Sequence, residues 1–215
     1  MRESNIWDYL YSRGFNKENI AKQGEWLEKY NQYVEPLKQE IILDLGCGEG
    51  GNALYYKNLG YRVVACDFSQ VVLDRIKRRD PDMAVINFDM REGIPYDENS
   101  IGVVVASLSI HYFDLEQTKK VIGSVYRCLK AGGYFIYRVN SYKEYERNKD
   151  NMLECIEEDF YKTKNGKKKR YFTIESMARL LNDDFQIIQN FDTELFFNGV
   201  QKFAVEGIAL KPVKG

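Results

Sequence analysis

The sequence of 215 residues lacks several features that mark other classes of protein. It has one histidine and four cysteines, and no two cysteines form a C-x-x-C pair, so neither a metal centre nor a disulfide framework is expected. No segment approaches the roughly 20 apolar residues that cross a bilayer, and no signal-peptide core follows the first residues. We therefore expect a cytoplasmic protein that binds neither a metal nor a membrane.

The sequence also lacks an excess of charge of either sign. It has 31 lysines and arginines against 32 acidic residues, for a formal net charge of −1. Domains that bind nucleic acid through their overall field are usually strongly basic, so a nucleic-acid partner is not expected, although a local patch could serve one. With 44% hydrophobic and 29% charged residues, the composition predicts one globular domain with at most a small appendage.

The sequence does contain a strand, a glycine-rich turn and a helix in immediate succession. The apolar run 41–45 leads into Gly-Cys-Gly-Glu-Gly-Gly at 46–51, and a helical pattern follows at about 50–59. Glycine suits such a turn because it adopts positive φ and lets the backbone approach a ligand closely. The helix N-terminus then offers free N–H groups. In parallel sheets, ligands bind at this end of the strands.

Acidic side chains accompany three successive predicted strands. Asp44 lies in the first strand, Asp67 ends the second at 61–67, and Asp89 ends the third at 83–90. The glycine turn also matches G-x-G-x-x-G, so an NAD-dependent oxidoreductase is an alternative. However, a carboxylate at Asp44 would repel a pyrophosphate and suits a ligand with an ammonium or sulfonium group.

The segment D-L-G-C-G-E-G at 44–50 resembles the first motif of the class I S-adenosylmethionine-dependent methyltransferases, of the small-molecule type. The string L-K-A-G-G at 129–133, followed by an aromatic strand, is a second resemblance and marks architecture rather than the site. The loop 93–100 before the fourth strand is also typical of the family. The matches cover roughly residues 36–140 and 171–213.

The resemblance implies an α/β, Rossmann-like fold. Its seven-stranded sheet would be mostly parallel, with one antiparallel strand near the edge and helices on both faces. The last two predicted strands, 185–191 and 202–210, agree with this fold, because the connection at 192–200 has no helical pattern and can join only an antiparallel pair.

The resemblance also implies S-adenosylmethionine as the cofactor and a role for each residue near it. The glycine loop and Asp44 would hold the methionine part, Asp67 the ribose hydroxyls, and Asp89 the adenine amine, with Phe68 and Met90 beside the ring. The alternatives are core packing for Phe68 and a turn cap for Asp89. The candidate cofactor-binding residues are Asp44, Gly46, Cys47, Gly48, Gly50, Asp67, Phe68, Asp89, Met90 and Ser107.

The candidate catalytic residues are His111 and Tyr112, since a histidine–aromatic pair after the fourth strand is frequent in the family. His111 has a pKa suited to a general base near neutral pH. A structural role is the alternative, because methyl transfer to sulfur or to an unprotonated nitrogen needs no strong base. The Asn-Pro-Pro-aromatic signature of amino-group methylation is absent after the fourth strand, which disfavours DNA adenine or protein glutamine as the acceptor.

We expect a single methyltransferase domain over residues 1–215 with two additions. Aromatic residues in 1–35 predict helices that form a lid or simply pack on the sheet. Residues 141–170 form a polar, tyrosine-rich insert, with a short helix at 151–160 and a hairpin about the Asn-Gly pair at 165–166. This insert either lies on the substrate side or is a solvated hairpin.

The expected activity is methyl transfer from S-adenosylmethionine to a small-molecule acceptor. The alternatives are an NAD-dependent oxidoreductase and a non-catalytic, S-adenosylmethionine-binding regulatory protein. The sequence leaves open the acceptor molecule, the acceptor atom and the oligomeric state.

Overall fold

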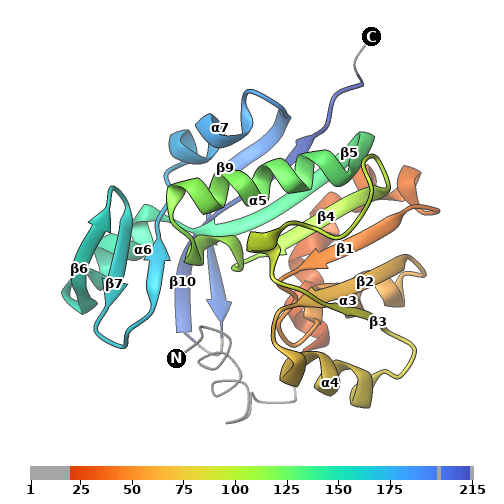
Figure 1. The fold of residues 1–215 in the computed structure, drawn as a ribbon, viewed down its shortest axis with the longest axis horizontal. Coiled ribbons are helices and arrows are strands. Elements are labelled where there is room, and N and C mark those ends of the chain that lie inside the picture. The colour runs from red at the N-terminus through yellow and green to blue at the C-terminus, as the bar shows by residue number, and fades with distance from the viewer. Residues whose placement is uncertain (1–19, 198–199, 214–215) are drawn as a thin grey trace.

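The computed structural model describes residues 20–197 and 200–213, and its centre is a seven-stranded sheet (Figure 1). The strand order is β3-β2-β1-β4-β5-β10-β9. The strands are β1 (Ile41–Leu45), β2 (Arg62–Asp67), β3 (Ala84–Asn87), β4 (Ile101–Ser107), β5 (Leu129–Asn140), β9 (Gln186–Phe197) and β10 (Val200–Leu210). The predicted Rossmann-like α/β class is confirmed.

Only β10 runs against the other strands of this sheet. The strands from β3 to β5 pair in parallel, whereas β10 is antiparallel to both β5 and β9. Because β10 lies between β5 and the edge strand β9, the sheet has one antiparallel strand next to its edge, as the sequence predicts. The two last strands are longer than predicted, and their pairing extends to Val200 opposite Phe197.

Helices cover both faces of the sheet, each through an apolar side. On one face, α5 (Leu115–Cys128) shares a cluster of buried residues with β4 and β5, and α7 (Ile174–Leu181) packs mainly against β9 and β10. On the other face, α3 (Gly51–Asn58) and α4 (Gln70–Arg79) share a second cluster of buried residues with β1, β2 and β4. Strand β4 lies between the two clusters and is buried on both sides, which explains its unbroken apolar sequence.

The helical segment before the sheet packs onto α3. It consists of a 3₁₀ helix, η2 (Ala21–Tyr30), then α2 (Asn31–Val34) and the 3₁₀ turn η3 (Glu35–Leu37). A Cβ on Gly24 of η2 would lie 2.3 Å from the Cβ of Tyr55, so this residue must be glycine for η2 to lie so close to α3. The helices predicted within 1–35 are thus confirmed from Ala21 to Val34, whereas residues 1–19 lie outside the described part of the chain.

The insert at 141–170 forms a small sheet beside the main one (Figure 1). It begins with α6 (Tyr142–Asn148) and the 3₁₀ turn η6 (Lys149–Asn151), and continues as β6 (Met152–Glu157), β7 (Phe160–Thr163) and β8 (Lys168–Arg170). The helix predicted at 151–160 is wrong, because most of that segment pairs with β7 as a strand. The predicted turn is confirmed, with Gly166 at φ 82° between β7 and β8.

One further boundary differs from expectation. Helix α5 ends at Cys128 and β5 begins at Leu129, so the L-K-A-G-G string lies within the strand, whereas the sequence predicts a strand that follows the string. Separately, none of the helices in residues 20–197 and 200–213 combines the length and apolar character needed to cross a membrane.

Candidate cofactor and acceptor site

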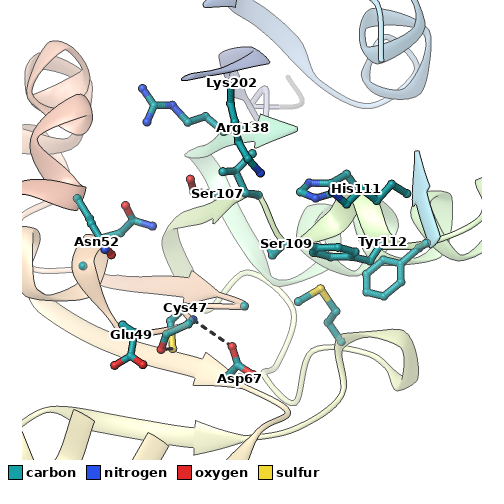
Figure 2. A pocket seen from close by; sticks show the side chains of 18 of the residues that line it. Cys47, Glu49, Asn52, Asp67, Ser107, Ser109, His111, Tyr112, Arg138 and Lys202 are labelled. Atoms are coloured by element: carbon teal, nitrogen blue, oxygen red, sulfur yellow. Dashed lines mark hydrogen bonds between the residues drawn. The ribbon is translucent and has the colours of Figure 1, made fainter. Parts of the chain in front are cut away.

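A cavity of about 730 Å³ opens at the C-terminal ends of the parallel strands (Figure 2). Its walls come from the turn after β1, the end of β2, the loop after β3 and the segment after β4. Side chains of η2, β5, the β7–β8 turn, β8 and the β9–β10 hairpin complete it. Its volume lies in the range of about 300–1,000 Å³ that small-molecule sites occupy.

The floor of the cavity is the glycine turn between β1 and α3. Gly46, Gly48 and Gly50 have φ values of 70°, 53° and 80°, in the left-handed region that side-chain-bearing residues avoid. A Cβ on Gly46 would also lie 2.4 Å from the Cβ of Ser109. Gly46 and Gly48 line the cavity, whereas Gly50 precedes the first turn of α3 and is not among the lining residues.

Cys47, between the first two glycines, also lines the cavity. Its backbone N–H donates to the carbonyl of Cys66 at 2.8 Å, which ties the turn to β2. The side chain is buried, and burial together with the charges of Asp44 and Asp67 raises the pKa of the thiol. Cys47 is therefore a protonated, compact side chain in this turn rather than a nucleophile.

Asp44 lies behind the turn rather than on the cavity wall. Its carboxylate accepts hydrogen bonds from the N–H of Ala53 at 3.0 Å and from Asn52 Nδ2 at 3.3 Å. Asn52 Oδ1 in turn accepts from Trp26 Nε1 at 2.9 Å, and both Asn52 and Trp26 line the cavity. Burial raises the pKa of Asp44 to about 7. The position of Asp44 therefore lets it fix the turn and orient Asn52.

Asp67 ends β2 and lies on the cavity wall, as Figure 2 shows. One carboxylate oxygen accepts from the N–H of Gly48 at 3.0 Å and the other from the N–H of Ser69 at 3.0 Å. These bonds join the turn after β1 to the turn after β2. Phe68, the next residue, lines the same wall.

Asp89 and Met90 line the cavity from the loop after β3. Asp89 is the N-cap of the 3₁₀ turn η4 (Met90–Glu92) and pairs with Arg91, with a closest distance of 2.5 Å. Burial acts to raise the pKa of Asp89, but hydrogen bonds from the side chain and backbone of Arg91 outweigh it and lower that pKa. Asp89 therefore caps this turn, which was the alternative interpretation of the sequence, and it also borders the cavity.

The chain turns sharply after β4, at the segment that lines the cavity between Ser107 and Phe113. Leu108 has a φ of 54°, a conformation that costs energy for a side chain of this size, and its N–H donates to the carbonyl of Arg138 at 2.8 Å. Ser109 Oγ donates to the carbonyl of Leu45 at 2.8 Å. These bonds hold Ser107 and His111 against the cavity.

His111 and Tyr112 lie together on the 3₁₀ turn η5 (Ile110–Tyr112), with their ring centroids 4.2 Å apart. His111 is only 1% exposed, and its buried Nδ1 atom has no hydrogen-bond partner in the part of the chain that the structure describes. Burial, with a smaller effect of three lysines, lowers the pKa of His111 well below its usual 6.5. The imidazole is therefore neutral at pH 7.

The structure adds lining residues that the sequence did not single out as site residues. They include Trp26, Asn52, Arg138, Glu194, Lys202 and the lysines at 167–169. Arg138 projects from β5, donates from Nε to Glu206 at 2.5 Å, and lies 3.9 Å from the centroid of Trp26. A charged residue inside a predicted central strand is a signal that could have identified Arg138. No local pattern marks Lys202, which reaches the cavity only because β10 pairs with β5.

Residues 43–137 match the model of a family described as a methyltransferase domain. Among curated proteins, the chain is 24% identical over 203 residues to the tRNA N(3)-methylcytidine methyltransferase trm140 of Schizosaccharomyces pombe, covering 86% of this chain and 64% of that protein. It is 33% identical over 133 residues to a cypemycin N-terminal methyltransferase of Streptomyces sp, covering 60% of this chain and 54% of that protein. The chain thus spans less than two thirds of the length of these relatives.

Among solved structures, a SAM-dependent methyltransferase from Methanosarcina mazei superimposes with a TM-score of 0.76 at 20% identity. The match covers 86% of this chain and 98% of that one, so the two share a fold. Residues 43–137 are therefore similar to methyltransferase domains. The Methanosarcina mazei relative is described as SAM-dependent, which names S-adenosylmethionine as its methyl donor.

The residues around the donor end of the cavity fit S-adenosylmethionine. The turn presents backbone without Cβ atoms at Gly46 and Gly48, where the ligand must approach closely. The Asp67 carboxylate borders the space, and the side chains of Phe68 and Met90 supply apolar surface for a planar ring. The carboxylate of Asp67 on the cavity wall gives this end a negative charge, which suits a sulfonium.

Proposed function

We propose that the protein transfers a methyl group from S-adenosylmethionine to a small-molecule acceptor bound at the His111 end of the cavity. One observation carries the proposal: a single cavity contains both the glycine turn with Asp67 and the pair His111–Tyr112. The first set of residues would hold the donor, and the second would border the acceptor. Binding both molecules in one enclosed space is what a direct transfer requires.

The cofactor, when bound, supplies a methyl group that its sulfonium has already activated. The chain itself would bind and orient the cofactor and the acceptor, and it would exclude water from the site. Asp67 would accept hydrogen bonds from the ribose hydroxyls, Phe68 and Met90 would contact the adenine, and the turn at Gly46 and Gly48 would hold the methionine part. Alignment of the reacting groups can lower a barrier by several kcal/mol, on the order of 7–11 kcal/mol in the best intramolecular cases.

His111 and Tyr112 would act on the acceptor. The Nδ1 of the neutral His111 imidazole has no hydrogen-bond partner among the described residues and can exchange a hydrogen bond with the attacking group of the acceptor. Burial raises the pKa of the Tyr112 hydroxyl, so that this group stays protonated. Its low pKa makes His111 a weak base, which suits an acceptor atom that needs orientation more than deprotonation.

A second candidate acceptor is a cytidine of tRNA. The similarity to trm140, which extends over 86% of this chain, favours it. The hairpin of the insert also carries two exposed lysines, Lys164 and Lys168, of which Lys168 lines the cavity. If RNA is the acceptor, the donor end binds S-adenosylmethionine as described above, and only the molecule bound at the His111 end differs.

The test is transfer of a radiolabelled methyl group from S-adenosylmethionine. The purified protein is incubated separately with a cell extract from which proteins and nucleic acids have been removed, and with unfractionated tRNA. Label in the small-molecule fraction, lost in a His111→Gln variant that still binds S-adenosylhomocysteine, supports the proposal. Label only in tRNA would overturn the small-molecule acceptor and retain the donor. Label in neither would contradict catalysis.

A further inference from the structure

Glu206, on β10, is a buried carboxylate outside the cavity. It is 0% exposed and is not among the described residues that line the cavity. Three groups donate to it: Lys29 Nζ and the Tyr30 hydroxyl to one oxygen, each at 2.8 Å, and Arg138 Nε to the other at 2.5 Å. A buried carboxylate is tolerated only with such partners. Glu206 therefore joins the C-terminal end of η2 to the side chain of Arg138 on β5.

The side chain of Arg138 connects Glu206 to the wall of the cavity. Arg138 lines the cavity (Figure 2). Its guanidinium carbon lies 3.9 Å from the ring centroid of Trp26, which also lines the cavity. A guanidinium is planar and stacks on an aromatic face through that plane. Because the bond from Nε to Glu206 fixes the direction of the plane, the position of the Trp26 indole depends on Glu206.

Trp26 in turn fixes the orientation of the Asn52 amide in the first turn of α3. The indole Nε1 donates to Asn52 Oδ1 at 2.9 Å, and Asn52 Nδ2 donates to the Asp44 carboxylate at 3.3 Å. An indole N–H can only donate, and the two ends of an amide differ, so this bond selects one orientation of Asn52. In the opposite orientation the Asn52 oxygen would face the Asp44 carboxylate. The chain of contacts from Glu206 thus ends at the glycine turn.

Stability alone does not account for a carboxylate at this place. Buried ion pairs can often be replaced by apolar residues of similar volume without loss of stability. Apolar contacts also join η2 to α3, because Leu27 belongs to the same buried cluster as Ala53 and Tyr56. What the ion pair adds is the direction of the Arg138 guanidinium, which an apolar residue at position 206 would not fix.

We propose that Glu206 is a positioning residue of the donor site. It acts through Arg138 and Trp26 on the Asn52 amide, and so on the part of the cavity wall that would border S-adenosylmethionine. The inference rests on the proposed function and adds to it a residue that touches neither the donor nor the acceptor.

The first test is isothermal titration with S-adenosylhomocysteine of the unaltered protein and of Glu206→Gln. The substitution keeps the size of the side chain and removes its charge. It should weaken binding by about 3- to 10-fold, which corresponds to the net loss of about one hydrogen bond. Leu181→Ala, in the core on the other face of the sheet, is the control for lost stability. It should lower the unfolding temperature and leave the affinity unchanged.

A double-mutant cycle tests whether Glu206 acts through Trp26. Trp26→Phe keeps an aromatic ring and removes the N–H that donates to Asn52. In this background Glu206→Gln should change the affinity by less than about twofold, because the connection to Asn52 is already broken. Arg138→Lys keeps a cation for Glu206 but lacks the planar face, so it replaces Glu206→Gln in the cycle if that variant does not fold.

The fluorescence of Trp26 gives a readout that a general loss of stability would not change. The sequence has two tryptophans, so Trp7→Phe leaves Trp26 as the single one. In this background and without ligand, Glu206→Gln should shift the emission to longer wavelength, because the indole loses its contact with Arg138 and becomes more exposed. Leu181→Ala should leave the emission unchanged.

The outcomes separate the positioning role from the donor site itself. Unchanged affinity in folded Glu206→Gln, an equal loss of affinity in Leu181→Ala, an unshifted Trp26 emission, or full additivity with Trp26→Phe would overturn the positioning role. Absence of binding by the unaltered protein would instead contradict the donor site of the proposed function.

Discussion

Replacing Asp44 with asparagine should change how the stability of the protein depends on pH. Asp44 is fully buried behind the glycine turn, and burial raises its pKa to about 7. In the unfolded chain the same carboxyl has a pKa near about 3.9. Between these two values the folded state holds a proton that the unfolded state has lost. Since the unfolded state binds fewer protons there, the free energy of unfolding falls as pH rises from about 4 to about 7.

The magnitude follows from the difference of about 3 pKa units. At about 1.4 kcal/mol per unit, the ionised Asp44 lowers the free energy of unfolding at pH 8 by about 4 kcal/mol relative to pH 4. Asp44→Asn removes this titration. The substitution also lowers the free energy of unfolding by an amount that does not depend on pH. Asn52 Oδ1 accepts from Trp26, so Asn52 turns its NH₂ group toward residue 44. An asparagine NH₂ at position 44 would then meet a donor where it needs an acceptor. The test therefore uses how the stability difference between the two proteins changes with pH, and not the constant part of that difference.

The assay is urea unfolding at half-unit steps from pH 4 to pH 8, without ligand. The difference between the original protein and Asp44→Asn should decline by about 4 kcal/mol across this range. Asp97→Asn, which replaces an exposed carboxyl in the loop before β4, is the matched control for the same substitution at the surface. A flat difference for Asp44→Asn would refute the assignment of Asp44 as a buried group that ionises only near neutral pH.

Four further variants test the site and the structure around it. Asp67→Ala should weaken S-adenosylmethionine binding by about 1–3 kcal/mol in calorimetry, since it removes the carboxylate proposed to hold the ribose; unchanged affinity would remove that role. Gly46→Ala should lower both the unfolding temperature and cofactor affinity, because φ is 70° and the added Cβ clashes. In contrast, Gly123→Ala in α5 should stabilise the protein by about 0.5–1 kcal/mol, because no atom of the described residues outside the local helix backbone lies within 4 Å of the added Cβ. Glu206→Gln should destabilise it by about 3–5 kcal/mol in urea unfolding, because it leaves the buried Arg138 guanidinium without its counter-charge.

The central sheet could be predicted because its signals are local. The apolar run at 101–106, the glycine turn at 46–51 and the capping residues Ser69 and Asp114 each determine structure within a few residues. The same locality explains why most predicted cofactor residues gather at one cavity, since the ends of parallel strands must meet at one edge.

The features that could not be predicted from the sequence depend on long-range packing. The segment 152–157 forms a strand only because β7 folds back on it, and nothing within the segment itself requires a strand. Lys202 and the lysines at 167–169 approach His111 through strand pairing and the bond from Arg170 to Phe113. The placement of Asp44 behind the turn was also not predictable, because sequence position alone does not tell which way a carboxylate at the end of a strand points.

The most direct test of the account is isothermal titration of the purified protein with S-adenosylmethionine and, separately, with NADH. The geometry of the glycine turn and of Asp67 predicts saturable binding of one S-adenosylmethionine per chain, with weaker binding in Asp67→Ala, and no binding of NADH. Binding of NADH, or of neither molecule, would contradict the assignment of the cavity as a methyl-donor site.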